Sequence, residues 1–153
     1  MVLYGYNAYN RLVSYTDESG NITSYAYTPD GLRSSKTKNG TTTNFYWDRG
    51  YISTESKNGT VTAKNYVGIN GIFAREANNT TDYMLKNGHG DVTALVRNGA
   101  ITRTYDYDAY GVQKNIDPTD TNPFRYCGEY FDKESGSIYL RARYYDPSVG
   151  RFL

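Results

Sequence analysis

Large and small side chains alternate in short segments along most of the chain. The segment "SYAYT" places Tyr25 and Tyr27 on one face, and "NFYWD" does the same for Phe45 and Trp47. A period of two residues is that of a β-strand, whose successive side chains point to opposite faces. No stretch shows a helical periodicity that competes with it. The pattern therefore predicts short strands throughout the chain.

Pairs of turn-forming residues separate these segments about every ten residues. Asn-Gly between alternating segments is a strong hairpin signal, because both residues reach positive φ at low cost. Each unit of about twenty residues is thus predicted to be a β-hairpin, with six units between Tyr4 and about Lys114. The pairs form two interleaved series: Ser19-Gly20, Asn39-Gly40, Asn58-Gly59, Asn78-Asn79 and Asn98-Gly99, and Asp30-Gly31, Arg49-Gly50, Asn70-Gly71, His89-Gly90 and Tyr110-Gly111.

The end of the chain departs from the regular spacing. Residues 115–124 hold two prolines and several Asp and Asn residues, which predicts a loop. Residues 124–132 and 137–146 flank a turn at Glu134-Ser135-Gly136, and we expect them to pair as one further hairpin. On a straight strand over 137–146, Tyr139, Arg141 and Arg143 would share one face.

Composition supports an all-β chain and excludes some functions. The chain has 18 Tyr, 15 Gly and a net charge of +1, with Lys and Arg dispersed. Tyrosine favours strands and glycine favours turns. Nucleic-acid binding is not expected, because it needs clustered positive charge. No apolar run reaches the length of a membrane span, and the first residues lack the pattern of a signal peptide.

Several fragments resemble a known family of repeats. "YNAYNRL", "YAYTPDGLR" and "YDYDAYG" are similar to the YD repeats of bacterial Rhs proteins, wall-associated toxins and animal teneurins. Residues 82–153 resemble the longer Rhs-associated core that closes such arrays. We therefore expect a YD-repeat hairpin array over 1–114 that overlaps a core-like segment over 82–153, in one continuous domain.

The resemblance implies a fold and a role. Consecutive antiparallel hairpins would form a curved or spiralling sheet, part of a hollow β-shell. In toxin members this shell encloses a C-terminal cargo domain, so the expected partners are that cargo and the remaining shell repeats. The expected function is that of a structural shell and plug in a secreted or cell-surface toxin-delivery protein. The chain is accordingly expected to be a piece of something longer.

Simple geometry limits what this chain can enclose. About fourteen strands spaced ~4.8 Å apart make a sheet roughly 65 Å across, which closes into a ring about 20 Å in diameter. A cargo domain of ~100 residues has a radius of gyration near 13 Å and does not fit inside. The chain is therefore expected to supply a stretch of wall and a plug. Its open sheet edges predict self-association.

The resemblance also implies where self-cleavage chemistry would lie. The family core cuts the chain beyond itself with aspartates and an arginine. The arginine in "RARYYDP" corresponds to Arg143, with Arg141 as the second choice. The aspartate that follows "GRF" in relatives has no counterpart before Leu153. An autoproteolytic core is thus an alternative, but we expect no catalytic residue and no enzyme activity here.

Aromatic rows suggest a second alternative, a carbohydrate-binding surface module that recognises cell-surface glycans. Exposed rings could stack on sugars, although recurrence at one register is also what sheet packing demands. The candidate stacking residues are Tyr25, Tyr27, Phe45, Trp47 and Tyr66.

Other chemistry-bearing residues are few, and we expect no cofactor and no metal. The single cysteine, Cys127, excludes an internal disulfide and is expected to be a small buried side chain. The single histidine, His89, lies in a turn far from it in sequence. Asp106 and Asp108 could hold calcium on one strand face, but a turn and a solvated side chain are the favoured interpretation.

Charged residues near the end of the chain are predicted to form ion pairs that anchor this segment. The arginines in question are Arg141, Arg143 and Arg151, and the carboxylates are Glu129, Asp132 and Asp146.

Overall fold

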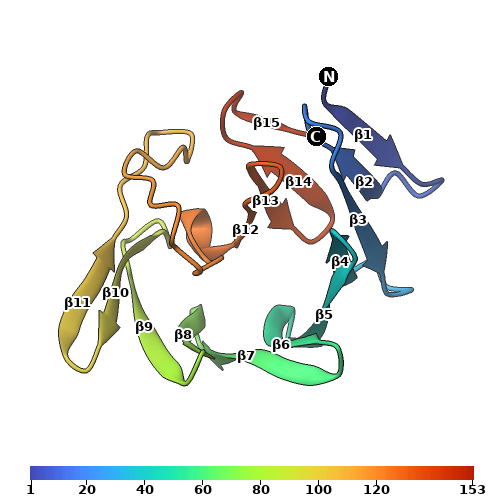
Figure 1. The fold of residues 1–153 in the computed structure, drawn as a ribbon. Coiled ribbons are helices and arrows are strands. Elements are labelled where there is room, and N and C mark those ends of the chain that lie inside the picture. The colour runs from blue at the N-terminus through green and yellow to red at the C-terminus, as the bar shows by residue number, and fades with distance from the viewer.

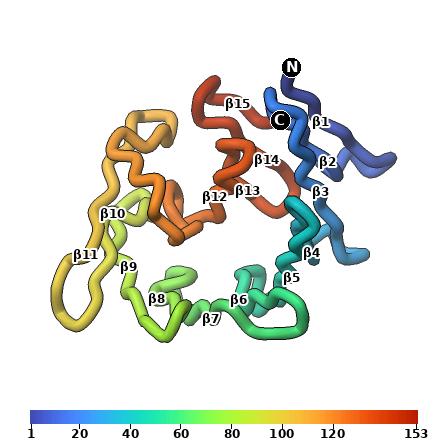
Figure 2. Tube along the Cα trace, viewed as in Figure 1, coloured from blue at the N-terminus to red at the C-terminus, as the bar shows by residue number.

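The computed structural model describes residues 1–153, and the fold is all-β, as predicted. Fifteen strands form two antiparallel sheets, and one short 3-10 turn, η1 (Tyr126–Gly128), is the only helical element. The first sheet curves around the second, and the two termini lie near each other (Figure 1). The backbone trace follows one continuous path from the curved sheet into its interior (Figure 2). No helix has the length and apolar character needed to cross a membrane.

The first sheet is a meander of eleven strands in which each strand pairs with its neighbours in sequence. Every pairing is antiparallel, so this part of the fold is a succession of hairpins, as the repeat pattern predicts. The strands are β1 (Leu3–Tyr6), β2 (Leu12–Thr16), β3 (Ile22–Tyr27), β4 (Arg33–Lys38), β5 (Thr41–Asp48), β6 (Tyr51–Lys57), β7 (Thr60–Gly68), β8 (Gly71–Ala77), β9 (Thr80–Lys86), β10 (Val92–Arg97) and β11 (Ala100–Thr104).

Two-residue turns close six of the ten hairpins of the first sheet, and in five of these turns both residues have positive φ. At Asn39-Gly40 both residues have positive φ, 49° and 73°. This conformation matches the twist of the flanking strands and favours Asn and Gly. The same geometry recurs at Arg49-Gly50, Asn58-Gly59, Asn78-Asn79 and Asn98-Gly99.

Five-residue loops close most of the others, and a side chain braces each of them. In the loop 17–21, Asp17 Oδ1 accepts hydrogen bonds from the backbone N–H groups of Ser19 and Asn21, both at 2.9 Å. Such a side chain replaces backbone partners that a short turn cannot supply. The other braced loops cover residues 7–11, 28–32, 87–91 and 108–112.

The sixth predicted repeat is only a short, irregular hairpin without regular strands. Tyr107 and Gln113 form an isolated antiparallel bridge, and Lys114 N donates to the Asp106 carbonyl at 2.8 Å. The side chain of Asn115 takes over the backbone partners here, because it accepts from Asp106 N and donates to Thr104 O, both at 2.9 Å. Tyr105 and Tyr107 still share one face, with nearly parallel rings 6.3 Å apart.

The second sheet contains four strands in sequence order, β12 (Tyr130–Asp132), β13 (Ser137–Leu140), β14 (Arg143–Asp146) and β15 (Arg151–Phe152). It follows the predicted loop over 115–124, which holds no strand. Our prediction of one straight strand over 137–146 is wrong. The chain reverses at Arg141, whose φ is 61°, so that Leu140 pairs with Arg143.

The reversal has a packing cause. On a straight strand Tyr139 and Tyr144 would point to opposite faces. The turn instead places them opposite each other, with ring centroids 5.1 Å apart, and both are buried. Burying two large rings outweighs the left-handed backbone at one arginine.

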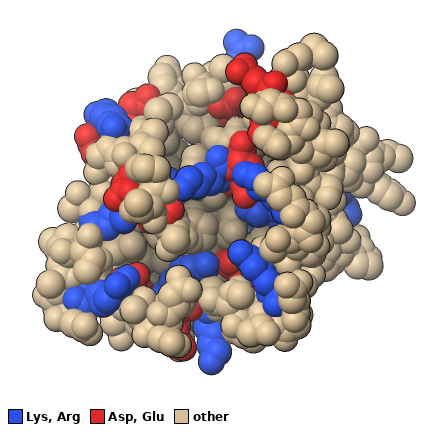
Figure 3. All heavy atoms as spheres, viewed as in Figure 1, with Lys and Arg blue, Asp and Glu red and all other residues tan.

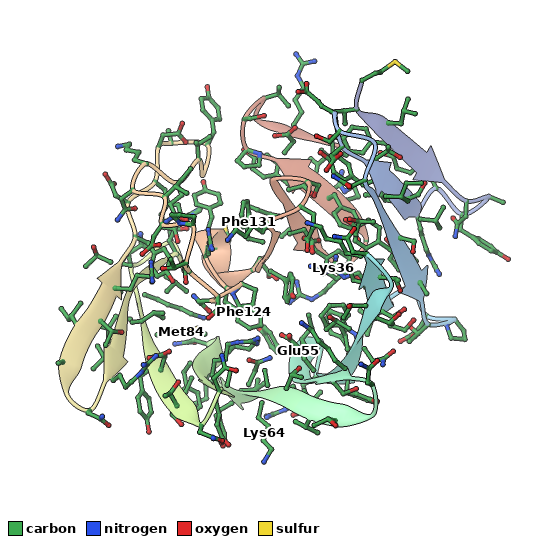
Figure 4. The ribbon with its side chains drawn as sticks, in the orientation of Figure 1. Lys36, Glu55, Lys64, Met84, Phe124 and Phe131 are labelled. Carbon is green, nitrogen blue, oxygen red and sulfur yellow. The ribbon has the colours of Figure 1, made fainter.

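The core lies between the concave face of the first sheet and the second sheet. Rings from the two sheets meet in pairs: Tyr25 with Tyr144 at 5.6 Å and Phe45 with Tyr130 at 5.4 Å. Figure 4 shows Lys36 and Glu55 pointing into the space between the sheets, whereas Lys64 points to the outside. The remaining core members are Leu12, Tyr15, Ile52, Ile72, Met84, Val92, Leu95, Tyr105, Phe124 and Tyr139.

Candidate functional site

A buried arginine lies at the centre of the contact between the sheets. Arg33, the first residue of β4, is 0% exposed. Its guanidinium lies 4.4 to 5.9 Å from the centroids of five aromatic rings. Each ring face attracts the cation, and the attraction strengthens where water is absent. The rings belong to Tyr25, Phe45, Tyr130, Tyr139 and Tyr144.

The carboxylate of Asp132 in β12 neutralises this arginine. Arg33 Nη1 donates to Asp132 Oδ2, and Lys36 Nζ donates to Asp132 Oδ1 at 3.0 Å. Burial alone would raise the pKa of Asp132, but the two cations outweigh it and hold that pKa below its usual value. Lys36 also pairs with Glu134 at 3.0 Å. The charges of Arg33 and Lys36 are thus matched by Asp132 and Glu134.

Further hydrogen bonds connect the backbone and side chain of Arg33 to aromatic residues of both sheets. Arg33 N–H donates to the Tyr139 hydroxyl at 2.8 Å, and Trp47 Nε1 donates to the Arg33 carbonyl at 2.9 Å. The Tyr144 hydroxyl lies 3.2 Å from Arg33 Nη1 and 3.1 Å from the Tyr27 hydroxyl. These bonds link β3, β4 and β5 of the first sheet to β13 and β14 of the second.

A second polar cluster lies on the concave face further along the first sheet. Arg75 donates to Glu55 Oε1 at 2.7 Å and to Asn65 Oδ1 at 2.9 Å, and Asn65 donates to the Ile52 carbonyl. A cavity of about 400 Å³ next to Arg75 is lined mostly by polar side chains. Figure 3 shows Lys and Arg side chains around a hollow near the middle of this face. The inner surface is therefore polar beyond the aromatic core.

Arg141 and Arg143, the two arginines implied by the family resemblance, contact different residues. Arg141 pairs with Glu129 at 2.9 Å and donates to the Gly50 carbonyl at 2.8 Å, which confirms one predicted ion pair. Arg143 lies over the Phe152 ring at 4.0 Å, with no carboxylate in contact. Neither arginine faces a pair of carboxylates.

Two other predicted pairs are wrong. Asp132 binds Arg33 and Lys36 instead of an arginine near the end of the chain. Asp146 Oδ1 accepts from the backbone N–H of Ser148 at 2.9 Å and from its hydroxyl at 2.6 Å, in the turn between β14 and β15.

The five aromatic residues considered for glycan stacking do not form one exposed row. Tyr25 and Phe45 are buried, 5% and 4% exposed. Tyr27 and Trp47 pack against the core, and the Tyr27 hydroxyl donates to the Leu12 carbonyl at 2.6 Å. Tyr66 is on the opposite, outer face, because Asn65 occupies the inward position of β7. The aromatic residues therefore do not occupy the same face of the sheet in every repeat.

The prediction for Cys127 is also wrong. The residue is exposed, and its Sγ lies 3.9 Å from His89 Nδ1. Their wide separation in sequence concealed this contact. The alternative for Asp106 and Asp108 is resolved in favour of the turn, since Asp108 Oδ1 accepts from two backbone N–H groups of the loop 108–112. The Asp106 side chain is in solvent.

Comparison with known proteins agrees with this architecture. The RHS Repeat family model matches residues 6–43. The tRNA3(Ser)-specific nuclease WapA of Bacillus spizizenii is 32% identical over 98% of this chain, and the tRNA nuclease WapA of Bacillus subtilis is 31% identical over the same share. The crystal structure of TcdB2-TccC3-Cdc42 matches 99% of this chain with a TM-score of 0.78 at 20% identity.

Together these findings define a repeat protein of consecutive antiparallel hairpins with the fold of a segment of the TcdB2-TccC3 structure. The chain is an RHS-repeat (YD-repeat) protein, related to WapA over nearly its whole length. It spans 7% of the length of each of these WapA proteins and 9% of the matched structure.

Proposed function

We propose that this chain forms part of the wall and of the closing plug of a hollow shell, and that it acts without catalysis of its own. One observation carries the proposal: a curved, uninterrupted sheet of eleven strands holds a second sheet inside its curve through a buried ion pair. A wall needs continuous strand pairing, and a plug needs a fixed seat on that wall. Both features are present, and the Arg33–Asp132 pair lies where they meet.

The dimensions support a partial wall. Eleven strands about 4.8 Å apart span roughly 50 Å, too little to encircle a folded domain of ~100 residues. The free edges of β1 and β11 are where further repeats would continue the sheet. The remaining repeats of a parent protein are therefore the first partners that we propose.

The second proposed partner is a cargo domain at the C-terminal end of the parent. The WapA relatives are named as tRNA nucleases, and one related structure is of a Tc holotoxin pore of Photorhabdus luminescens. A toxic enzyme must be kept from its own cell until delivery, which an enclosing wall achieves. By the same reasoning we propose a secreted or cell-surface location for the parent.

The shell role can be tested on the full-length parent protein by limited proteolysis. Native protein should protect its C-terminal domain from trypsin, compared with the same domain expressed alone. Replacing Arg33 with methionine should loosen the plug and expose the domain, whereas Arg49→Met, which breaks an exposed pair with Asp48, should not. Equal cleavage of the enclosed and the isolated domain would contradict the proposal.

Free edges also predict self-association of the present chain. Unpaired strand edges bind other strands, and exposed apolar residues on them favour the contact. Leu3 on β1 and Ile101 on β11 are both exposed. Light scattering after size exclusion should show a mass that rises with concentration. Leu3→Lys with Ile101→Lys should shift the protein to monomer, and Val61→Lys on the central strand β7 should not. A monomer at every concentration would count against available edges.

A further inference from the structure

Three metal-ligating side chains of different chemistry converge beside the loop 87–91. His89 Nδ1 lies 2.9 Å from Asp91 Oδ1 and 3.9 Å from Cys127 Sγ. One ligand atom from each residue lies within 4.8 Å of the other two. The cluster shares no residue with the inter-sheet ion pair of Arg33, Lys36 and Asp132.

Hydrogen bonds between side chains and the backbone fix the positions of all three residues. Asn87 Oδ1 accepts from the N–H groups of His89 and Asp91, each at 3.0 Å, which sets the loop. Asp91 Oδ1 in turn accepts from Cys127 N at 2.8 Å, and this bond ties η1 to the loop. Cys127 has a φ of 54°, a left-handed conformation that a non-glycine residue adopts only when its surroundings demand it.

We propose that His89, Asp91 and Cys127 form a binding site for Zn²⁺, with solvent completing the coordination. Thiolate, imidazole and carboxylate are the three ligand types that zinc takes in proteins, at about 2.0 to 2.3 Å from the metal. Tetrahedral ligands at those lengths lie about 3.3 to 3.6 Å apart. The distances from His89 Nδ1 to Asp91 Oδ1, 2.9 Å, and to Cys127 Sγ, 3.9 Å, lie on either side of that range, so small side-chain shifts would bring the three ligand atoms around one ion. Sulfur and nitrogen donors together disfavour Mg²⁺ and Ca²⁺. The His89 side chain is 58% exposed, so an ion can enter from solvent.

A catalytic cysteine–histidine pair does not fit the same geometry. Asp91 and Cys127 both face the Nδ1 atom of His89. A base that activates a thiol needs one ring nitrogen for the sulfur and the other for an orienting partner. On binding, the metal replaces the thiol proton, which leaves to solvent as the S–Zn bond forms.

Titration of the reduced protein with Co²⁺ tests the site, because a thiolate ligand to cobalt produces a charge-transfer absorption band. We expect one ion per chain and displacement of the band by Zn²⁺. His89→Gln and Asp91→Asn should each weaken binding at least about tenfold, and Cys127→Ser should abolish the band. Asp91→Asn keeps an oxygen that accepts from Cys127 N–H. Asp106→Asn, which removes an exposed carboxylate elsewhere, is the control and should change nothing.

Alkylation of Cys127 gives a second readout that does not depend on variants. Zn²⁺ should slow the reaction of the thiol with iodoacetamide in the native chain, and Mg²⁺ should not. Absence of the cobalt band, unchanged Co²⁺ affinity in Cys127→Ser, or equal alkylation rates with and without Zn²⁺ would each overturn the site. Circular dichroism of each variant establishes that a lost signal comes from a folded protein.

Discussion

Replacing Arg33 with methionine should lower the free energy of unfolding by about 3–5 kcal/mol, the usual cost of removing one partner of a buried ion pair. The substitution leaves the fully buried Asp132 with Lys36 as its only cationic partner. It also removes the cation from a cage of five aromatic rings. Urea unfolding followed by the fluorescence of Trp47 measures the change, because this sole tryptophan packs in the same contact.

Two further variants distinguish the effect of the unpaired buried charge from that of replacing any arginine by methionine. Arg49→Met removes an exposed partner of Asp48 and should change stability by less than about 1 kcal/mol. Adding Asp132→Asn to Arg33→Met removes the unpaired carboxylate and should recover part of the loss. A cost for Arg33→Met no larger than that for Arg49→Met would show that the ion pair does not hold the two sheets together.

Raising the pH should also destabilise the protein strongly, and the unfolding transition should be steep in pH. Burial raises the pKa of five core tyrosines above the value of about 10 for a free phenol; for Tyr139 the pKa reaches about 12. Their contribution to stability is complete below pH ~10 and is lost as pH rises toward their pKa values in the folded protein. The reason is that above pH ~10 these tyrosines ionise in the unfolded chain while they are still protonated in the folded one. In this pH range, five such groups together lower the free energy of unfolding by about 7 kcal/mol per pH unit. The other four are Tyr25, Tyr105, Tyr130 and Tyr144.

Phenolate absorbance and circular dichroism recorded against pH should therefore change together, between about pH 11 and 12 for a domain of ordinary stability. Tyr25 provides a clean test, because its buried hydroxyl has no hydrogen-bond partner. Tyr25→Phe should cost nothing at neutral pH and move the transition to higher pH. Tyr9→Phe, at an exposed ring, should leave it unchanged. Gradual ionisation of all tyrosines without loss of structure would contradict the burial of these hydroxyls.

The repeat architecture was predictable from sequence because its causes are local. Positive φ at Asn39-Gly40 and its equivalents follows from two residues, and the alternation of Tyr25 and Phe45 with polar neighbours follows from one strand each. The error at 137–146 had a different origin. The turn at Arg141 is stabilised by the contact between Tyr139 and Tyr144, and a single-strand pattern contains no sign of it.

The inter-sheet contact could not be predicted in the same way. Arg33 follows a turn in a polar segment, and its sequence context is that of a solvated residue. Its burial depends on Asp132, 99 residues away. The aromatic positions showed only that many rings would pack, and not that they would surround a cation. Likewise, the proximity of His89 and Cys127 depends on how η1 meets the loop 87–91.

Each strand of the first sheet pairs only with the strands before and after it in the chain. Gaining or losing one hairpin therefore preserves every other pairing, as in other linear repeat arrays. The length of the curved sheet can therefore change by steps of about twenty residues while the order and register of the remaining strands stay the same.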